Sequence, residues 1–152
     1  MIQALILSLL LNYLPATPAL AMPAPGTILN QYLAPLTPYS GGHRGIDIES
    51  QINEEVLSPA TGTISFVGKV GYRNLITVSF GDKKSSLEPV CSELLEGTLV
   101  TQGEVIGRVC EPDPQYQWHC EITCIHFGIR NSDGYFSPLA LIGGLSPSRL
   151  VP

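Results

Sequence analysis

Apolar and polar residues alternate in two segments of the chain, which is the pattern of β-strands. Residues 76–80 alternate strictly, with Ile, Val and Phe on one side and Thr and Ser on the other. Residues 124–130 show the same period, and there Cys124, His126 and Gly128 share the face opposite three large apolar side chains. Both segments therefore predict strands with one buried face, and His126 is expected on the polar face beside Cys124.

Glycine and proline interrupt the apolar segments at short intervals from residue 56 onward. The interruptions include Gly62, Gly68, Gly71, Gly81, Gly97, Gly103, Gly107, Pro112, Pro114 and Gly134. No stretch after residue 21 shows helical periodicity over three turns. Short strands separated by such turns are typical of an all-β domain, and antiparallel sheets are the expected arrangement.

The first 21 residues differ from the rest of the chain. Residues 4–14 are nearly all apolar, and residues 19–21 form a small-x-small cleavage pattern. The apolar run is shorter than the about 20 residues that cross a bilayer, so a permanent membrane span is not expected. A buried N-terminal helix is the alternative, but Pro15 and Pro18 would interrupt it. We predict that residues 1–21 are a signal peptide, although no Lys or Arg precedes Arg44 to form the usual basic start.

The remaining chain is expected to form a short lead-in and one folded domain. Residues 22–42 are uncharged and rich in proline and glycine, so they should run extended over the surface, outside the core. Residues 43–152 have a suitable length for a single core. The whole chain of 152 residues is 44% hydrophobic and 14% charged, which argues against disorder. A formal net charge of -5 with scattered basic residues argues against nucleic acid as a partner.

Four cysteines in a short exported chain indicate disulfide bonds, because the extracytoplasmic compartment is oxidising. Four thiols allow more than one complete set of pairs, and the sequence does not choose among them. Cys120 and Cys124 are close enough to pair locally, which leaves Cys91 to pair with Cys110. This is the preferred arrangement.

The segment from Gly41 to Asp47 carries the most distinctive chemistry. His43 and Asp47 are separated by a glycine, Gly45, that lets the backbone bend and aim both side chains at one point. Neutral imidazole and ionised carboxylate both bind zinc. A third ligand would have to come from a distant strand, and His126 is the candidate. Three protein ligands that leave a fourth position for water are the pattern of a catalytic zinc site.

These motifs resemble lysostaphin-type peptidoglycan metalloendopeptidases over about residues 41–141. His43 to Asp47 is similar to the HxGxD motif of that family, and Cys124 to Phe127 resembles its HxHF strand. Three further segments resemble family motifs in the expected order: Pro59 to Ile64, Val100 to Gly107 and Tyr135 to Leu139. The resemblance is closest to an actinobacterial branch. It implies an open β-sandwich with an antiparallel β-sheet groove, of the duplicated hybrid motif type, with zinc bound by His43, Asp47 and His126.

The chain departs from the family at two catalytic positions. In active members the first histidine of HxH acts near the zinc-bound water, and here Cys124 replaces it. A second catalytic histidine is also absent, and Glu88 stands in its place. Loss of a general base costs about 10² to 10⁴ in rate.

Three outcomes follow from these departures. In the first, Glu88 and His119 act as the catalytic residues and activity survives. In the second, Cys124 is a thiolate and a fourth ligand, which closes the site into a structural zinc. In the third, Cys124 is paired with Cys120, the zinc keeps an open position, and the protein binds wall peptides without cutting them efficiently.

The expected function is therefore that of a secreted or envelope-attached zinc endopeptidase that cuts peptide cross-links of peptidoglycan. The alternative is an impaired relative that keeps the zinc site and binds the wall, or regulates a partner cell-wall hydrolase. The glycine-containing segments also resemble halves of lipoyl or biotinyl carrier domains. Such carriers need an exposed lysine in a characteristic setting, and Lys69, Lys83 and Lys84 lack it.

Overall fold

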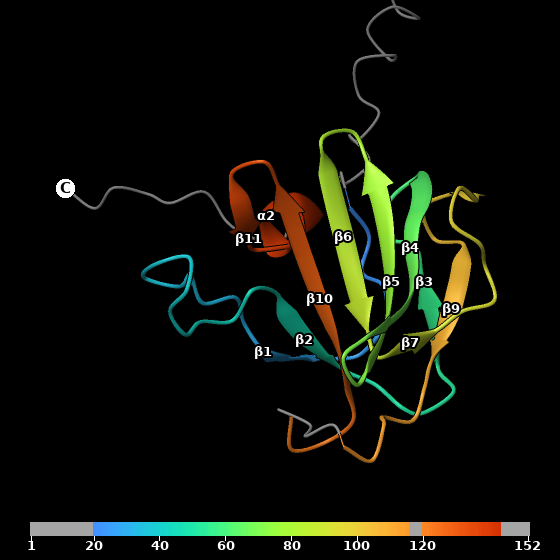
Figure 1. Ribbon diagram of the computed structural model, residues 1–152, viewed down its shortest axis with the longest axis horizontal. Coiled ribbons are helices and arrows are strands. Elements are labelled where there is room, and N and C mark those ends of the chain that lie inside the picture. Colours follow the sequence, from blue (N-terminus) through green and yellow to red (C-terminus); the bar gives the residue numbers. More distant parts are fainter. Residues whose placement is uncertain (1–19, 116–119, 144–152) are drawn as a thin grey trace, which may run out of the picture.

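The computed structural model describes residues 20–115 and 120–143 and consists almost entirely of strands (Figure 1). The strands are β1 (Ile28–Asn30), β2 (Ile46–Glu49), β3 (Glu55–Leu57), β4 (Gly62–Val70), β5 (Arg73–Phe80), β6 (Lys83–Glu88), β7 (Val90–Cys91), β8 (Leu99–Val100), β9 (Val105–Val109), β10 (Cys124–Asn131) and β11 (Gly134–Phe136). The described part also includes one short helix, α2 (Leu139–Ile142). The all-β prediction is confirmed.

The strands form two antiparallel sheets. The larger sheet has the order β1-β2-β10-β6-β5-β4-β8, and β11 pairs with β10 beside this path. The smaller sheet has the order β3-β9-β7. In Figure 1, β10, β6, β5 and β4 stand side by side at the centre, and the small sheet lies near β4 and β5. The long central strands β10 and β6 therefore provide the platform on which a site can be built.

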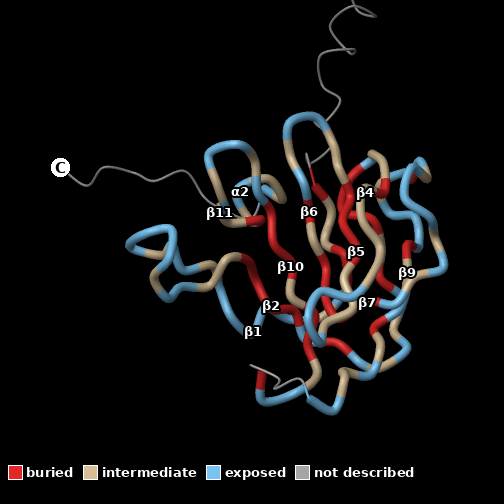
Figure 2. Tube along the Cα trace, viewed as in Figure 1, coloured by how far each residue is buried: buried red, intermediate tan, exposed pale blue. Residues whose placement is uncertain are grey.

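The core is formed by the apolar face of the central strands, as the alternation of residues predicts. In β10, Ile125, Phe127 and Ile129 are fully buried, and Ile76 and Val78 of β5 join the same cluster. Figure 2 shows this buried band along the middle of the large sheet. Burial of each such side chain contributes about 1.5 to 3 kcal/mol to folding. Because the side chains of a strand alternate, packing of this face fixes the direction in which His126 points.

The segment before β2 differs in part from the predicted surface lead-in. Pro23 and Ala24 are buried, and Ala24 belongs to the core cluster. Strand β1 then adds an edge to the large sheet by pairing with β2. The prediction that residues 22–42 lie wholly outside the core is therefore wrong for its first residues, because small apolar side chains fit against the sheet. Most of residues 25–42 are exposed, as expected.

Most of the predicted signal peptide, residues 1–19, lies outside the described residues. Leu20 is described, and it is fully buried with its backbone N–H donating to the carbonyl of Leu141. Among the described residues, no helix is both long enough and apolar enough to cross a bilayer.

Two disulfide bonds link the four cysteines in the preferred arrangement. Cys91 at the end of β7 pairs with Cys110, which follows β9. Cys120 pairs with Cys124 at the start of β10. Both predicted pairs are confirmed, and neither sulfur of a pair is available as a thiolate.

Candidate metal centre

The three predicted ligands meet where β2 lies against β10. Asp47 of β2 is the direct antiparallel partner of His126 of β10, so their side chains project from the same face of the sheet. His43 precedes β2 and is held by two backbone hydrogen bonds with Leu33. Strand pairing thus brings His126 next to Asp47, and the short loop before β2 places His43 beside them. His43 and His126 lie 83 positions apart in the sequence.

Gly45 makes this close approach possible. A Cβ atom at this position would overlap the carbonyl oxygen of Phe127 and would lie 2.7 Å from two atoms of the His126 ring. The buried backbone just before β2 can therefore pass the imidazole only without a side chain here. This packing explains why a glycine must separate His43 from Asp47.

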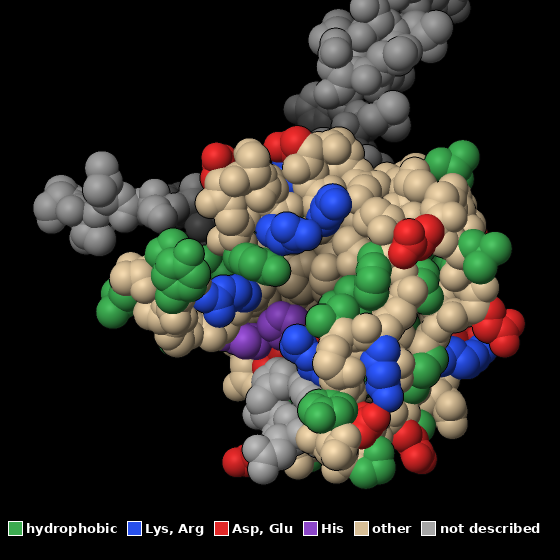
Figure 3. Space-filling view, viewed as in Figure 1, with side chains coloured by type: hydrophobic (Ala, Val, Ile, Leu, Met, Phe, Trp, Pro, Cys, Tyr) green, Lys and Arg blue, Asp and Glu red, His purple; other side chains and the backbone are tan. Residues whose placement is uncertain are grey.

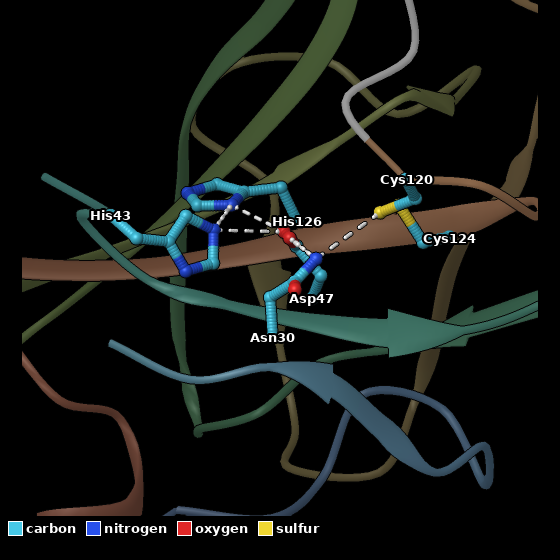
Figure 4. Close-up of a disulfide and its surroundings, with 6 residues drawn as sticks. All are labelled: Asn30, His43, Asp47, Cys120, Cys124 and His126. Carbon is cyan, nitrogen blue, oxygen red and sulfur yellow. Dashed lines mark hydrogen bonds and ion pairs between the residues drawn. A yellow bond between two sulfur atoms is a disulfide. The ribbon is translucent and has the colours of Figure 1, made fainter. Parts of the chain in front are cut away.

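The donor atoms of the three ligands converge on one point (Figure 4). His43 Nε2 lies 3.1 Å from Asp47 Oδ1 and 3.1 Å from His126 Nδ1. Asp47 Oδ1 lies 2.8 Å from His126 Nδ1. Ligands at a tetrahedral zinc stand about 3.3 Å from one another, given metal–ligand bonds of about 2.0 to 2.1 Å. The donor set and its spacing therefore fit a zinc ion after an outward movement of a few tenths of an ångström.

The environment of His43 sets its tautomer. Its Nδ1 lies 2.8 Å from the carbonyl oxygen of Gln31, and because a carbonyl only accepts, Nδ1 is the protonated nitrogen. In the neutral imidazole, Nε2 then directs a lone pair toward Asp47 and His126, as a metal ligand must. The two imidazole rings meet edge to face, with centroids 4.9 Å apart.

The second oxygen of Asp47 is held by a residue that the sequence analysis missed. Asn30 of β1 donates a hydrogen bond of 2.9 Å from its Nδ2 to Asp47 Oδ2. Asp47 is fully buried, so this bond satisfies one of its oxygens and leaves Oδ1 directed at the histidines. The only sequence signal was a polar residue that follows an apolar pair, which does not reveal the pairing of β1 with β2.

Residues 41–138 match the model of Peptidase family M23, which covers more than half of the chain. The chain belongs to peptidase family M23. The carrier-domain alternative is therefore wrong, and the predicted resemblance is confirmed.

Relatives of this M23 domain were found among proteins and among solved structures. The chain is 27% identical over 133 residues to the uncharacterized protein Rv2891 of Mycobacterium tuberculosis, covering 84% of the chain and 52% of that protein. The chain thus spans about half the length of this relative. The mycobacterial match is in keeping with the actinobacterial branch.

Two solved structures share the fold. The catalytic domain of lysostaphin from Staphylococcus simulans superposes with a TM-score of 0.65 at 19% identity, covering 78% of this chain and 92% of that one. A zinc-containing peptidase from Vibrio cholerae gives a TM-score of 0.60 at 19% identity, covering 73% of this chain and 35% of that one. At these identities the likeness concerns the fold alone.

Glu88 lies beside the candidate ligands of the M23 domain. It is the direct antiparallel partner of His126 at the end of β6, and only 6% of its surface is exposed. Its Oε1 forms an ion pair of 2.5 Å with Arg73. The structure therefore brings this predicted catalytic residue to the site, with one oxygen already engaged by a guanidinium that the sequence analysis missed.

The other departure, Cys124, and the second predicted catalytic residue, His119, have different outcomes. Cys124 is joined to Cys120, so the alternative in which its thiolate closes the site as a fourth ligand is wrong. Both sulfurs lie within 4.8 Å of a carboxylate oxygen of Asp47, but a disulfide is a poor substitute for a thiolate ligand. His119, the second predicted catalytic residue, lies outside the described residues.

A groove of about 870 Å³ runs from the histidines across the exposed face of the large sheet. Its lining includes His43, His126 and Glu88, together with apolar Phe66 and Tyr135. In the space-filling view, the histidines reach the surface next to a hollow that Lys and Arg side chains border (Figure 3). An open groove with this site at one end has room for an extended chain segment.

Proposed function

We propose that this M23 domain is a zinc-dependent endopeptidase that cuts peptide cross-links of peptidoglycan outside the cytoplasm. The convergence of His43, Asp47 and His126 carries the proposal, because three donor atoms within about 3 Å of one another match a zinc ligand set. When bound, zinc supplies Lewis-acid polarisation of a carbonyl and activation of water. Membership of a peptidase family and the expected signal peptide support the substrate and the location.

The protein's own residues would contribute positioning and proton handling. Asn30 and the carbonyl of Gln31 orient two of the ligands. The groove would hold a peptide along β10 and β6, with its scissile bond near His126. Glu88 would accept a proton with the oxygen that Arg73 does not engage, and His119 remains a second candidate for this task.

The alternative is a weakly active or inactive relative that binds the wall or regulates a partner hydrolase. Two observations favour it: Cys124 is held in a disulfide where the family carries a histidine, and Glu88 is paired with Arg73. Both reduce the supply of a free general base near the ligands. The zinc site would then help to bind wall peptides without cutting them efficiently.

A direct assay separates the two. Purified protein is loaded with zinc and incubated with peptidoglycan, and new free amino groups are counted. Release well above that of a matched His43→Ala variant supports the enzyme. Release equal to that of the variant supports the alternative, a weakly active or inactive relative. Absence of metal from the wild-type protein, measured by elemental analysis of the same samples, would refute both proposals.

A further inference from the structure

The groove face of β6 and β10 carries the candidate metal centre at one end and two basic side chains at the other. Alternate residues of the two strands pair directly across this face, and the three pairs are His126 with Glu88, Gly128 with Ser86, and Arg130 with Lys84. All six residues line the groove. From His126 to Arg130 the strand advances four residues, or about 13 Å. Two cations therefore stand together about 13 Å from the candidate metal centre.

The basic residues are distributed unevenly over the molecule. Seven of the eight Lys and Arg residues are described, Arg149 being outside the described part. Four of these seven line the groove: Arg44, Arg73, Lys84 and Arg130. The protein as a whole carries a formal net charge of -5, so this concentration does not follow from its overall composition.

The three basic residues outside the groove, among those described, all have carboxylate partners. Lys69 pairs with Asp113, Lys83 with Asp82, and Arg108 with Glu55. The hydrogen bond from Lys83 lowers the pKa of Asp82, and that from Lys69 lowers the pKa of Asp113. These cations are thus internally neutralised.

The cations of the groove are neutralised less completely. Arg73 pairs with Glu88, and Arg44 donates to the carbonyls of Pro38 and Ser40. Among the described residues, neither Lys84 nor Arg130 has a carboxylate at ion-pair distance, and both are exposed. Like charges directly opposite each other on antiparallel strands destabilise a sheet. An anion placed between Lys84 and Arg130 would offset this cost.

We propose that Lys84 and Arg130 form a subsite for a free carboxylate of the bound peptide, so that the domain selects acidic over amidated wall peptides. This inference rests on the proposed function of the groove. An arginine and a lysine provide several N–H donors for one carboxylate, and such charge-assisted bonds are stronger than neutral ones. The subsite fixes the peptide by an anionic group about 13 Å from the bond that is cut.

The rest of the groove favours a peptide over a phosphate polymer. Between the cation pair and His126 the strand faces carry only Ser86 and Gly128, which are neutral. Phe66, Leu75 and other apolar residues form part of the wall. A regular polyanion would need unpaired cations along its whole path, whereas an extended peptide with one carboxylate matches the single pair formed by Lys84 and Arg130.

The test compares binding of two wall-type peptides that differ only in a free carboxylate or its amide. Binding to the full chain is measured by calorimetry with a chelator present, so that hydrolysis does not interfere. We expect the acid to bind about tenfold more tightly than the amide, and the preference to fall as salt is raised. Arg130→Gln and Lys84→Gln should each reduce the preference several-fold and leave binding of the amide unchanged.

Lys83→Gln is the matched control, because Lys83 neighbours Lys84 but points to the other face of β6 and pairs with Asp82. It should retain the preference. Equal affinity for acid and amide, or an equal loss for both in Arg130→Gln, would overturn the proposal. Tighter binding of polyphosphate through the same two residues would overturn the peptide assignment. Because binding is read without turnover, an absence of cleavage with zinc would count against the proposed function and leave this result intact.

Discussion

Among the three candidate ligands, Asp47 is the one whose side chain is fully buried. A fully buried charge is costly unless it is paired or coordinates a metal. Asn30 satisfies one oxygen, and the two histidines lie beside the other. The local chemistry therefore favours a cation at the meeting point of the three side chains.

Replacement of Asn30 by alanine should weaken zinc binding about 10- to 100-fold, the usual cost of losing a residue that orients a metal ligand. The reason is that Asp47 Oδ2 would lose its donor and the carboxylate could rotate. Competition with a chromophoric chelator measures the affinity. Asn131→Ala is the control, since Asn131 bonds with Asp133 away from the site. Unchanged affinity in Asn30→Ala would refute the orienting role.

Restoring the family's histidine at position 124 should raise hydrolysis, if the missing base limits the rate. In the double variant Cys120→Ala/Cys124→His, we expect an increase of about 10² or more, within the usual contribution of a general base. Free amino groups released from zinc-treated peptidoglycan give the rate. Cys120→Ala/Cys124→Ala removes the same disulfide without adding a base, so a similar rate in both variants would contradict the explanation.

For the strands, residue alternation was sufficient to predict the segments around residues 76–80 and 124–130. It also predicted that His126 lies opposite the apolar face, because packing of that face leaves no other orientation. Strand register was not predictable, and the pairs Asp47–His126 and Glu88–His126 depend on it. Asn30 and Arg73 were missed for the same reason, since their contacts with Asp47 and Glu88 also depend on how neighbouring strands align.

The contact between the start of β2 and the middle of β10 should not tolerate a side chain at Gly45. In Gly45→Ala the new methyl group would press on the Phe127 carbonyl and the His126 ring. We expect a loss of about 1 to 3 kcal/mol in the free energy of unfolding, together with weaker zinc binding as the ring is displaced. Urea denaturation and chelator competition measure the two effects. Gly41→Ala is the matched control, because a Cβ there meets nothing within 4 Å. Equal stability and equal zinc affinity of the two variants would contradict the steric argument.

For the domain taken together, a bound metal would join segments that lie far apart in the sequence. His43 precedes β2, Asp47 lies within it, and His126 belongs to β10 at the centre of the large sheet. A ligand that binds only the folded state stabilises it by mass action. The site should therefore influence the unfolding of the entire domain as well as the chemistry in the groove.

Removal of zinc should consequently lower the thermal stability of the whole protein. At a free zinc concentration of about 100 times Kd the stabilisation is about 2.7 kcal/mol, which corresponds to roughly 5 to 10 °C in Tm for a chain of this size. Scanning calorimetry with zinc and with excess chelator measures the shift. His43→Ala loses one of three donors, so its Tm should respond little to zinc. A shift of the same size in His43→Ala would place the stabilising metal elsewhere, since the remaining pair, Asp47 and His126, would bind zinc far more weakly than the complete set.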